Sequence, residues 1–289
     1  MPALPPLFWA DMIELTLPAA DGFPLAAELR GEASRHCLLL IAPATGVRKT
    51  YYRAIAEFFA ERGFAVLTWD WRGLGASQPE PGSVLRVGMH EWANADMAGI
   101  RQWAAREWAG RPKVGIGHSF GGQAFGFGGH FEGLDGLVLV AAQNGYWGHW
   151  PSPRKLVYAG LWKVFLPAVT RVLGRFPGRL LGGGDDLPRE VALDWARWCR
   201  NPDYFGHETG HPTFKAPILS LSFSDDPYAP LPAVKALLDR YGSPSKEIRQ
   251  LEPAQVKLPA IGHFGFFRPK AAHLWQDIAT WLDRQLDQR

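Results

Sequence analysis

Residues 113–121 read Lys-Val-Gly-Ile-Gly-His-Ser-Phe-Gly, and this stretch decides the fold. Lys113–Ile116 has the character of a short buried strand, and the small residues after Gly121 could open a helix. A serine on such a strand-to-helix turn has a strained backbone, and the turn is so tight that only small residues fit on either side of the serine. Gly117-His118-Ser119-Phe120-Gly121 therefore predicts a nucleophilic serine. Because G-x-S-x-G occurs often by chance, the surrounding sequence must support it.

The chain before this motif alternates between strand and helix patterns. Two runs of alternating apolar and polar residues, 12–18 and 23–30, flank Ala20-Asp21-Gly22 and predict a hairpin. Short apolar runs at Cys37–Pro43 and Ala65–Trp69 predict buried strands. Helical spacing follows each of them, over 51–62 and 91–108. This order predicts an α/β fold with a mostly parallel sheet and helices on both faces.

The same alternation resumes later in the chain. Leu134–Ala142 and Pro217–Phe223 read as buried strands, and the roughly 70 residues between them are rich in tryptophan, glycine and proline. A connection of this length predicts a folded insertion, so we expect a core of residues 1–142 and 216–289 and a cap of residues 143–215. A last strand around 247–251 is expected between helices at 230–241 and 269–286.

Two further residues complete a pattern for nucleophilic catalysis. A serine hydroxyl needs a base, and the base needs an orienting acid. Asp225 and Asp226 directly follow the strand that ends at Phe223, and His263 lies in a loop before the last helix. The order Ser119, acid, His263 is the one associated with this type of serine turn. At this point either aspartate could be the acid, and His118 is expected to pack beneath the serine.

Composition excludes several classes of protein. The 289 residues carry 31 Lys plus Arg and 28 Asp plus Glu, a net charge of +3 without basic blocks, which argues against nucleic-acid binding. Two cysteines cannot form a disulfide framework. No uninterrupted apolar run reaches about 18 residues and no secretory signal is evident, so we expect no membrane span and a cytoplasmic protein.

One segment of the insertion has two interpretations. Leu161–Phe176 is amphipathic, with Lys163, Arg171 and Arg175 among leucine, valine and phenylalanine. The first interpretation is a helix packed on the core, and the second is a helix that docks on a membrane surface. The aromatic side chains of the insertion could form its own small core, or some could line an apolar pocket.

Several motifs together resemble the α/β-hydrolase fold superfamily over nearly the whole chain. The stretch from Asp70 to Ser77 is similar to its D-x-R-G-x-G-x-S turn, and Asp226-Pro227-Tyr228-Ala229-Pro230 is similar to its acid loop, which selects Asp226 over Asp225. Pro43–Val47, Gly117–Gly122 and Gly262–Arg268 resemble a bacterial subgroup of predicted hydrolases near the monoacylglycerol lipase and serine aminopeptidase branch. The resemblance implies that the insertion after the sixth strand forms a lid.

The chain departs from this family at one position. Many members have His-Gly after the third strand, and the next residue donates a backbone N–H to the oxyanion. Here Pro43-Ala44 takes that place, so Thr45 becomes the expected donor, together with the N–H of Phe120. Gly46 is the alternative if the loop register differs by one residue.

The remaining candidates point to no metal or cofactor. We expect none of the other histidines to bind a metal, although His207 and His211 have the spacing of an H-E-x-x-H motif. Neither Cys37 nor Cys199 lies in a motif that lowers a thiol pKa. These other histidines are His90, His130, His149, His207, His211 and His273. No glycine-rich stretch follows a strand with a phosphate-binding spacing.

Three functions fit the sequence. The first is a serine hydrolase that cleaves a carboxylic ester, thioester or small amide of an apolar acyl group, with Ser119, His263 and Asp226 as its triad. The second is an acyltransferase that uses the same triad in a dry site. The third is a non-catalytic binding protein for small molecules, since fold alone does not fix function. The complete triad favours the first.

Overall fold

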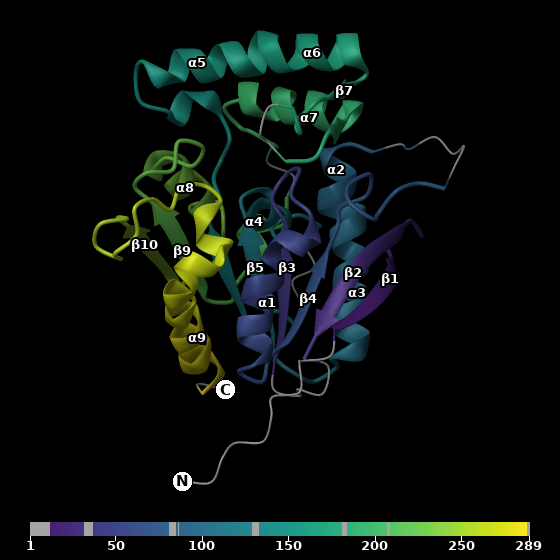
Figure 1. The fold of residues 1–289 in the computed structure, drawn as a ribbon, viewed down its shortest axis with the longest axis vertical. Coiled ribbons are helices and arrows are strands. Elements are labelled where there is room, and N and C mark those ends of the chain that lie inside the picture. Colours follow the sequence, from purple (N-terminus) through teal and green to yellow (C-terminus); the bar gives the residue numbers. More distant parts are fainter. Residues whose placement is uncertain are drawn as a thin grey trace.

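The fold is built on one eight-stranded sheet (Figure 1). The structure is a computed structural model, and it describes residues 12–31, 37–80, 85, 87–128, 133–180, 184–206 and 209–287. The strand order is β1-β2-β4-β3-β5-β6-β9-β10. The strands are β1 (Met12–Pro18), β2 (Pro24–Arg30), β3 (Leu38–Ala42), β4 (Ala65–Trp69), β5 (Lys113–His118), β6 (Gly136–Val140), β9 (Ile218–Phe223) and β10 (Lys246–Leu251).

The pairing of the strands confirms the predicted fold class. β1 and β2 form an antiparallel hairpin, and β2 also runs antiparallel to β4. The six strands from β4 to β10 in the sheet are parallel to one another. Parallel strands end at one edge of a sheet, and loops at that edge commonly carry the functional residues of α/β proteins.

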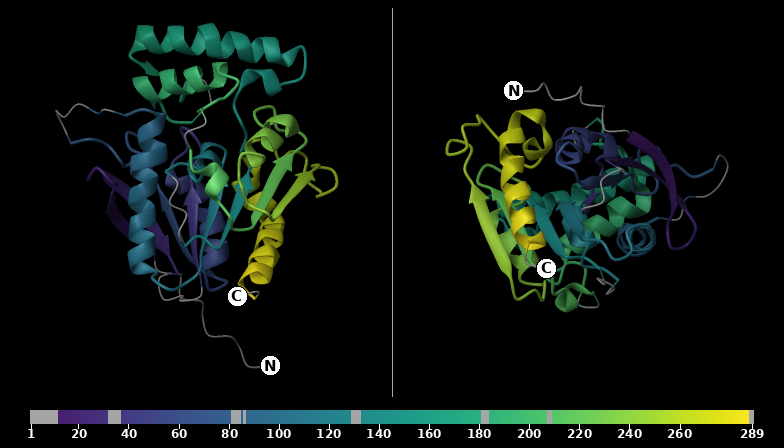
Figure 2. Two further views of the ribbon diagram at one scale, coloured as in Figure 1. Left: turned by 180° about the vertical axis from the view of Figure 1, so that it is seen from behind. Right: turned by 90° about the horizontal axis from the view of Figure 1, so that it is seen from below.

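Apolar residues on both faces of the strands explain why helices cover both sides. In β3, Leu39 and Ile41 pack into the core under α1 (Arg53–Ala60) and α9 (Ala272–Leu286). Leu38 and Leu40 point to the opposite face, which α3 (Met97–Glu107) covers and which is seen from behind in Figure 2. This is the two-sided burial expected of a parallel sheet. The other core helices are η1 (Lys49–Tyr52), α2 (Met89–Glu91), the π-helical turn η2 (Trp92–Asp96), α4 (Phe120–Ala124), α8 (Leu231–Leu238), η6 (Gly265–Phe267) and η7 (Pro269–Ala271).

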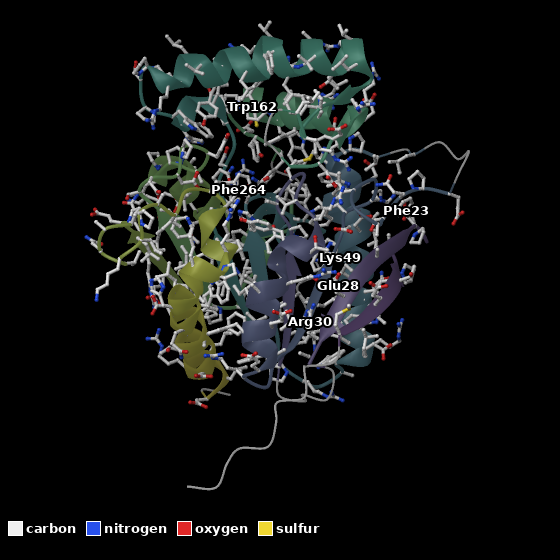
Figure 3. The ribbon with its side chains drawn as sticks, in the orientation of Figure 1. Phe23, Glu28, Arg30, Lys49, Trp162 and Phe264 are labelled. Carbon is white, nitrogen blue, oxygen red and sulfur yellow. The ribbon has the colours of Figure 1, made fainter. Side chains whose placement is uncertain are left out.

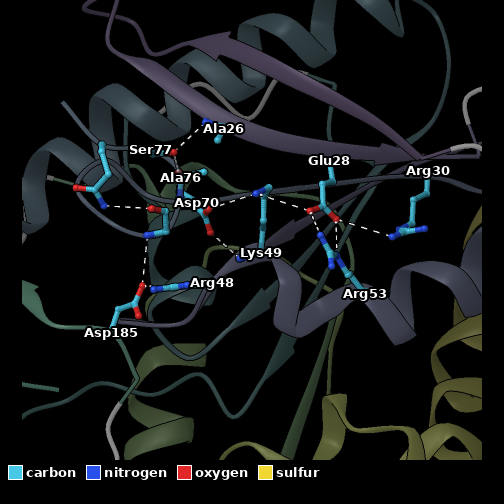
Figure 4. Close-up of polar contacts among 12 residues, drawn as sticks. Ala26, Glu28, Arg30, Arg48, Lys49, Arg53, Asp70, Ala76, Ser77 and Asp185 are labelled. Carbon is cyan, nitrogen blue, oxygen red and sulfur yellow. Dashed lines mark hydrogen bonds and ion pairs between the residues drawn. The ribbon is translucent and has the colours of Figure 1, made fainter. Parts of the chain in front are cut away.

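Asp70 anchors the turn that follows β4 (Figure 4). Its carboxylate accepts hydrogen bonds from the backbone N–H groups of Lys49 at 2.7 Å and Ala76 at 2.9 Å. The Ser77 hydroxyl donates to the backbone carbonyl of Asp70 at 2.8 Å, and the Lys49 ammonium lies between Asp70 and the buried Glu28. The polar groups of this network bond to one another, so its role is structural.

The segment between β6 and β9 forms a layer above the carboxyl edge of the sheet (Figure 1). The elements of this layer are η3 (Trp147–His149), α5 (Arg154–Gly160), the π-helical turn η4 (Leu161–Phe165), α6 (Leu166–Leu173), β7 (Arg175–Phe176), β8 (Leu187–Pro188) and α7 (Arg189–Arg200). The short helix η5 (His211–Thr213) lies on the return segment to β9, where His211 packs on Tyr241. Trp162 lies on the inner side of the upper helix, where its ring centroid is 4.8 Å from that of Trp195 (Figure 3). We call this layer the cap; its division from the core at residues 143 and 215 stays a prediction.

One helix of the cap has the length and composition of a membrane span. It runs from Arg154 to Leu173, has a mean hydropathy of 1.4 and is 28% buried over its most apolar window. From the sequence, the helical pattern was expected only over Leu161–Phe176, and no membrane span was expected. Length and composition alone are weak evidence for a span. The inner face of this helix packs against the rest of the cap, and Trp162, Leu166 and Thr170 on that face are buried.

A buried histidine makes stability depend on pH. His211 lies between the rings of Phe205 and Tyr241, and its Nε2 has no hydrogen-bond partner among the described residues. Burial, assisted by nearby Arg240, lowers its pKa to about 3. An unfolded histidine titrates near pH 6.5, so below that pH the unfolded state binds one proton more than the folded state.

We therefore expect His211→Phe to reduce the loss of stability on acidification. The wild-type free energy of unfolding should fall with decreasing pH, and this one group should contribute about 1.4 kcal/mol per pH unit below about pH 6. Urea unfolding from about pH 7 down to about pH 5 measures both slopes. Equal slopes for wild type and variant would show that His211 is not held neutral.

Candidate active site

Ser119 sits on the turn between β5 and α4 in a strained conformation. Its φ of 51° and ψ of −115° lie in a region that non-glycine residues rarely adopt. A Cβ atom on Gly117 would lie 2.4 Å from the backbone of Gly122, and one on Gly121 would lie 2.0 Å from the carbonyl oxygen of Ala42. The tight turn therefore requires the glycines of the G-x-S-x-G motif.

We expect Gly121→Ala to destabilise the protein by about 2 kcal/mol, because the new methyl group must displace the backbone of β3. Gly160→Ala is the matched control. Gly160 lies in α5, and a Cβ there meets nothing within 4 Å, so this variant should be about 0.5 to 1 kcal/mol more stable than wild type. Urea unfolding compares the two variants, and an equally stable Gly121→Ala would contradict the tight-turn argument.

His263 is hydrogen-bonded to Asp226. His263 Nδ1 lies 2.8 Å from Asp226 Oδ2, and both side chains are buried. The other carboxylate oxygen of Asp226 accepts hydrogen bonds from the N–H groups of Tyr228 at 2.8 Å and Ala229 at 3.1 Å. These three bonds fix the carboxylate with one oxygen directed at the imidazole ring. The geometry is that of an acid that orients a histidine base.

Asp225 has a different position. Its carboxylate accepts hydrogen bonds from the N–H groups of Ile261 at 2.8 Å and Gly262 at 3.0 Å. These two residues directly precede His263, so Asp225 holds the histidine loop and does not contact the ring. Of the two aspartates that the sequence left open, the geometry favours Asp226 as the partner of His263.

The Ser119 hydroxyl donates to Gln143 Oε1 at 3.4 Å. Within the described residues, no hydrogen bond joins Ser119 to His263; catalytic hydrogen bonds are often long before substrate binds. Gln143 was not predicted from the sequence, although it is a polar residue just after the apolar strand β6. The main-chain carbonyl of Gln143 accepts a hydrogen bond from Gln123 at 2.7 Å, which fixes this segment beside the serine.

Two backbone N–H groups near Ser119 lack a protein acceptor. In the described part of the chain, neither Thr45 nor Phe120 donates its N–H to a protein group. Ala44 is excluded as a donor, because its N–H binds the Tyr52 hydroxyl at 2.9 Å. Thr45 and Phe120 are thus available for the oxyanion, and the N–H of Gly46 is equally free among the described groups. Their role as the oxyanion donors stays a prediction.

His118 is completely buried beneath the serine turn. Its Nδ1 lies 2.8 Å from the Tyr52 hydroxyl, and its Nε2 lies 2.9 Å from the backbone carbonyl of His263. Burial, and then the neighbouring His263, hold the pKa of His118 well below its usual value, so the ring is neutral. His118 therefore connects the Ala44 loop to the histidine loop through Tyr52. The sequence predicted its packing but not these hydrogen bonds.

A cavity of about 380 Å³ opens beside these loops. Phe264, which follows His263, lies at the upper end of the core below the cap (Figure 3). Asp185 of the cap pairs with Arg48 at 2.5 Å and Arg179 at 3.1 Å. Burial opposes ionisation, but the two arginines lower the pKa of this carboxyl. The cavity is lined by Gly46, Val47, Arg48, Thr50, Tyr51, Gly184, Asp185, Phe264 and Arg268.

The cap also contacts the acid loop. Trp150 Nε1 and the Tyr158 hydroxyl both donate to the backbone carbonyl of Pro227, at 2.8 and 2.7 Å. Pro227 directly follows Asp226, so cap residues help to hold the loop that carries the acid. The cap therefore touches the site through both the Asp185 and the Pro227 contacts.

The described residues include no cluster of three or more His, Cys, Asp or Glu side chains that could hold a metal ion. His130 and His207 lie outside the described residues. Cys37 and Cys199 are both buried, and burial raises the pKa of the Cys199 thiol well above its usual value. A thiol in such surroundings is unreactive.

Comparison with known proteins identifies the family and agrees with the fold. The family model described as "Serine aminopeptidase, S33" matches residues 35–195. An esterase from Exiguobacterium antarcticum is similar in structure, with a TM-score of 0.62, 16% identity, and 94% of this chain and 100% of that chain covered. A thermophilic esterase from Thermogutta terrifontis has a TM-score of 0.59 and 21% identity, with 96% and 99% covered.

A third similar structure is DcsB in complex with its substrate analogue, with a TM-score of 0.67, 14% identity, and 96% of this chain and 99% of that chain covered. At these identities the solved structures establish the fold alone, whereas the family model spans more than half of the chain. The protein is therefore an α/β-hydrolase enzyme that belongs to the serine aminopeptidase, S33, family.

Proposed function

We propose that the protein is a serine esterase that cleaves carboxylic esters of apolar acyl groups. The observation that carries this proposal is the 2.8 Å contact between Asp226 and His263 at the sheet edge where strained Ser119 also lies. This pairing orients the second ring nitrogen of His263 for proton transfer. The hydrolase family and the fold agree with acyl transfer to water.

In the proposed reaction, the Ser119 hydroxyl leaves Gln143 and attacks the ester carbonyl while His263 takes its proton. The negative charge that forms on the carbonyl oxygen is stabilised by the N–H groups of Thr45 and Phe120. Protonated His263 then gives its proton to the departing alcohol, which leaves an acyl group on Ser119. Water, deprotonated by His263, releases the acid and restores the serine.

The family description also raises an aminopeptidase, but the paired state of Asp185 and the aromatic cap favour an ester. An enzyme that selects a free amino terminus needs a carboxylate that is ready to pair with an ammonium group. In the cavity, the Asp185 carboxylate already pairs with Arg48 and Arg179. The aromatic cap instead supports an apolar acyl group, because ligand pockets are mostly lined by apolar side chains. The cytoplasmic location remains the prediction from sequence.

The test is hydrolysis of chromogenic esters with acyl chains from acetyl to palmitoyl, with aminoacyl anilides assayed beside them. We expect turnover of esters by wild type, little turnover of anilides, and a best chain length that reports the size of the acyl pocket. Adding a competing alcohol distinguishes an esterase from an acyltransferase, because only an acyltransferase would form the new ester as its main product. Turnover of anilides alone, or of neither class, would reject the esterase.

A further inference from the structure

We propose that the outer face of the cap helix Arg154–Leu173 docks on anionic phospholipid membranes. The helix forms the outermost layer of the cap, above α7, and its side chains extend away from the core (Figures 1 and 3). This membrane docking goes beyond ester hydrolysis, and it is measured without any substrate. It combines the two interpretations of the amphipathic sequence, since the inner face packs within the cap and the outer face is proposed to dock.

The outer face is apolar along its whole length. Every fourth residue from Leu156 to Val172 is exposed, and none of these five residues is polar. The exposed fractions reach 65% for Leu156 and Val164 and 83% for Val172. The π-helical turn η4 lengthens the helical repeat in the middle of the helix, which helps to keep a four-residue spacing on one side. Continuous apolar surface of this kind marks an interaction site.

The same helix faces the core with a different set of residues. Trp162, Leu166 and Thr170 are buried and also follow a four-residue spacing. α6 and η4 both pack on α7. Because this inner face is already covered within the cap, the helix is suited to lie flat on a bilayer with its outer face buried, and crossing the bilayer would break these contacts.

The charge of the segment identifies the partner. Residues 154–179 contain Arg154, Lys155, Lys163, Arg171, Arg175 and Arg179 and no acidic residue, a formal charge of +6. The whole chain carries +3, so the remaining residues together carry +3 − 6 = −3. Arg175 and Arg179 pair with Asp186 and Asp185, but in the described part no carboxylate pairs with Arg154, Lys163 or Arg171. Cations beside an apolar face complement an anionic lipid surface.

The experiment is flotation of the purified full-length protein with two kinds of vesicle. One contains equal parts of phosphatidylglycerol and phosphatidylcholine, and the other contains phosphatidylcholine alone. We expect binding to the anionic vesicles that weakens when salt is raised, and much weaker binding to the neutral ones. Failure of the wild type to float with anionic vesicles would overturn the proposal.

Two variants locate the binding face. Val164→Glu/Val172→Glu places carboxylates at exposed positions, so folding should be unaffected. This double variant should bind the anionic vesicles about tenfold or more weakly than wild type. Ile248→Glu is its control, because Ile248 is also an exposed apolar residue but lies on β10. Equal losses for the two sites would overturn the proposal.

A charge-reversal pair separates local charge from net charge. Arg154→Glu/Lys163→Glu/Arg171→Glu should lower the affinity by about a hundredfold. The control Lys235→Glu/Lys270→Glu/Arg284→Glu changes the net charge of the protein equally at exposed positions outside the cap helix and should lower the affinity far less. Sedimentation velocity without lipid tests whether a second copy of the chain covers this face instead. The membrane proposal is rejected if the wild type forms a dimer that Val164→Glu/Val172→Glu dissociates and if the wild type does not bind vesicles.

Discussion

Replacing Ser119 by alanine is expected to lower kcat for ester hydrolysis by about 10⁴- to 10⁶-fold, because the variant lacks the hydroxyl group that forms the acyl-enzyme in the proposed reaction. Gln143, which accepts the serine hydroxyl bond at 3.4 Å, has no nucleophilic atom. The residual rate should come only from substrate binding and the oxyanion donors. Steady-state kinetics on the best ester of the chain-length series measures the loss.

Ser119→Gly is the informative companion variant. At a φ of 51° a side chain is strained, whereas glycine adopts this conformation freely. We therefore expect Ser119→Gly to lose activity like alanine and to gain about 1 to 2 kcal/mol in the free energy of unfolding. A serine-reactive phosphonate should label wild type alone, as seen by intact mass. Unchanged turnover by either variant would remove Ser119 from the mechanism.

The sheet could be predicted because its strands are short apolar runs covered on both faces. Ala65–Trp69 is predicted and observed with the same bounds, since glycine before it and a polar turn after it mark both ends. The cap helix shows where local sequence is insufficient. Its amphipathic pattern predicts residues 161–176, yet the helix begins at Arg154 and ends at Leu173 before Gly174, whose φ is 69°. Proline before the helix and a glycine C-cap explain these ends.

The candidate site could be predicted in part because its residues follow recognisable strands. Ser119, Asp226 and His263 each follow a predicted strand, and their chain order suggests a common sheet edge. Gln143 was missed because its contact with Ser119 joins the ends of β5 and β6, which only the strand order brings together. The hydrogen bond between Tyr52 and His118 likewise joins residues 66 positions apart. Tertiary contacts between polar side chains leave no local pattern in the sequence.

Asp226→Asn is expected to lower kcat/KM by about 10⁴-fold, and the surrounding hydrogen bonds explain why. Asp226 Oδ1 accepts two backbone N–H groups, from Tyr228 and Ala229. In the variant the amide oxygen should keep these bonds, so the amide NH₂ must face His263 Nδ1. That donor requires Nδ1 to be unprotonated, which places the imidazole proton on the nitrogen that should accept the proton of Ser119.

Asp225→Asn is the matched control, since it makes the same chemical change one residue earlier. Asp225 binds the N–H groups of Ile261 and Gly262 with one oxygen each, and asparagine can replace only one of these acceptors. We expect this variant to lose about 1 to 2 kcal/mol of stability and less than about tenfold in kcat/KM. A larger loss of activity in Asp225→Asn than in Asp226→Asn would transfer the role of the acid to Asp225, because a residue that only holds the loop cannot matter more than the one that orients the ring.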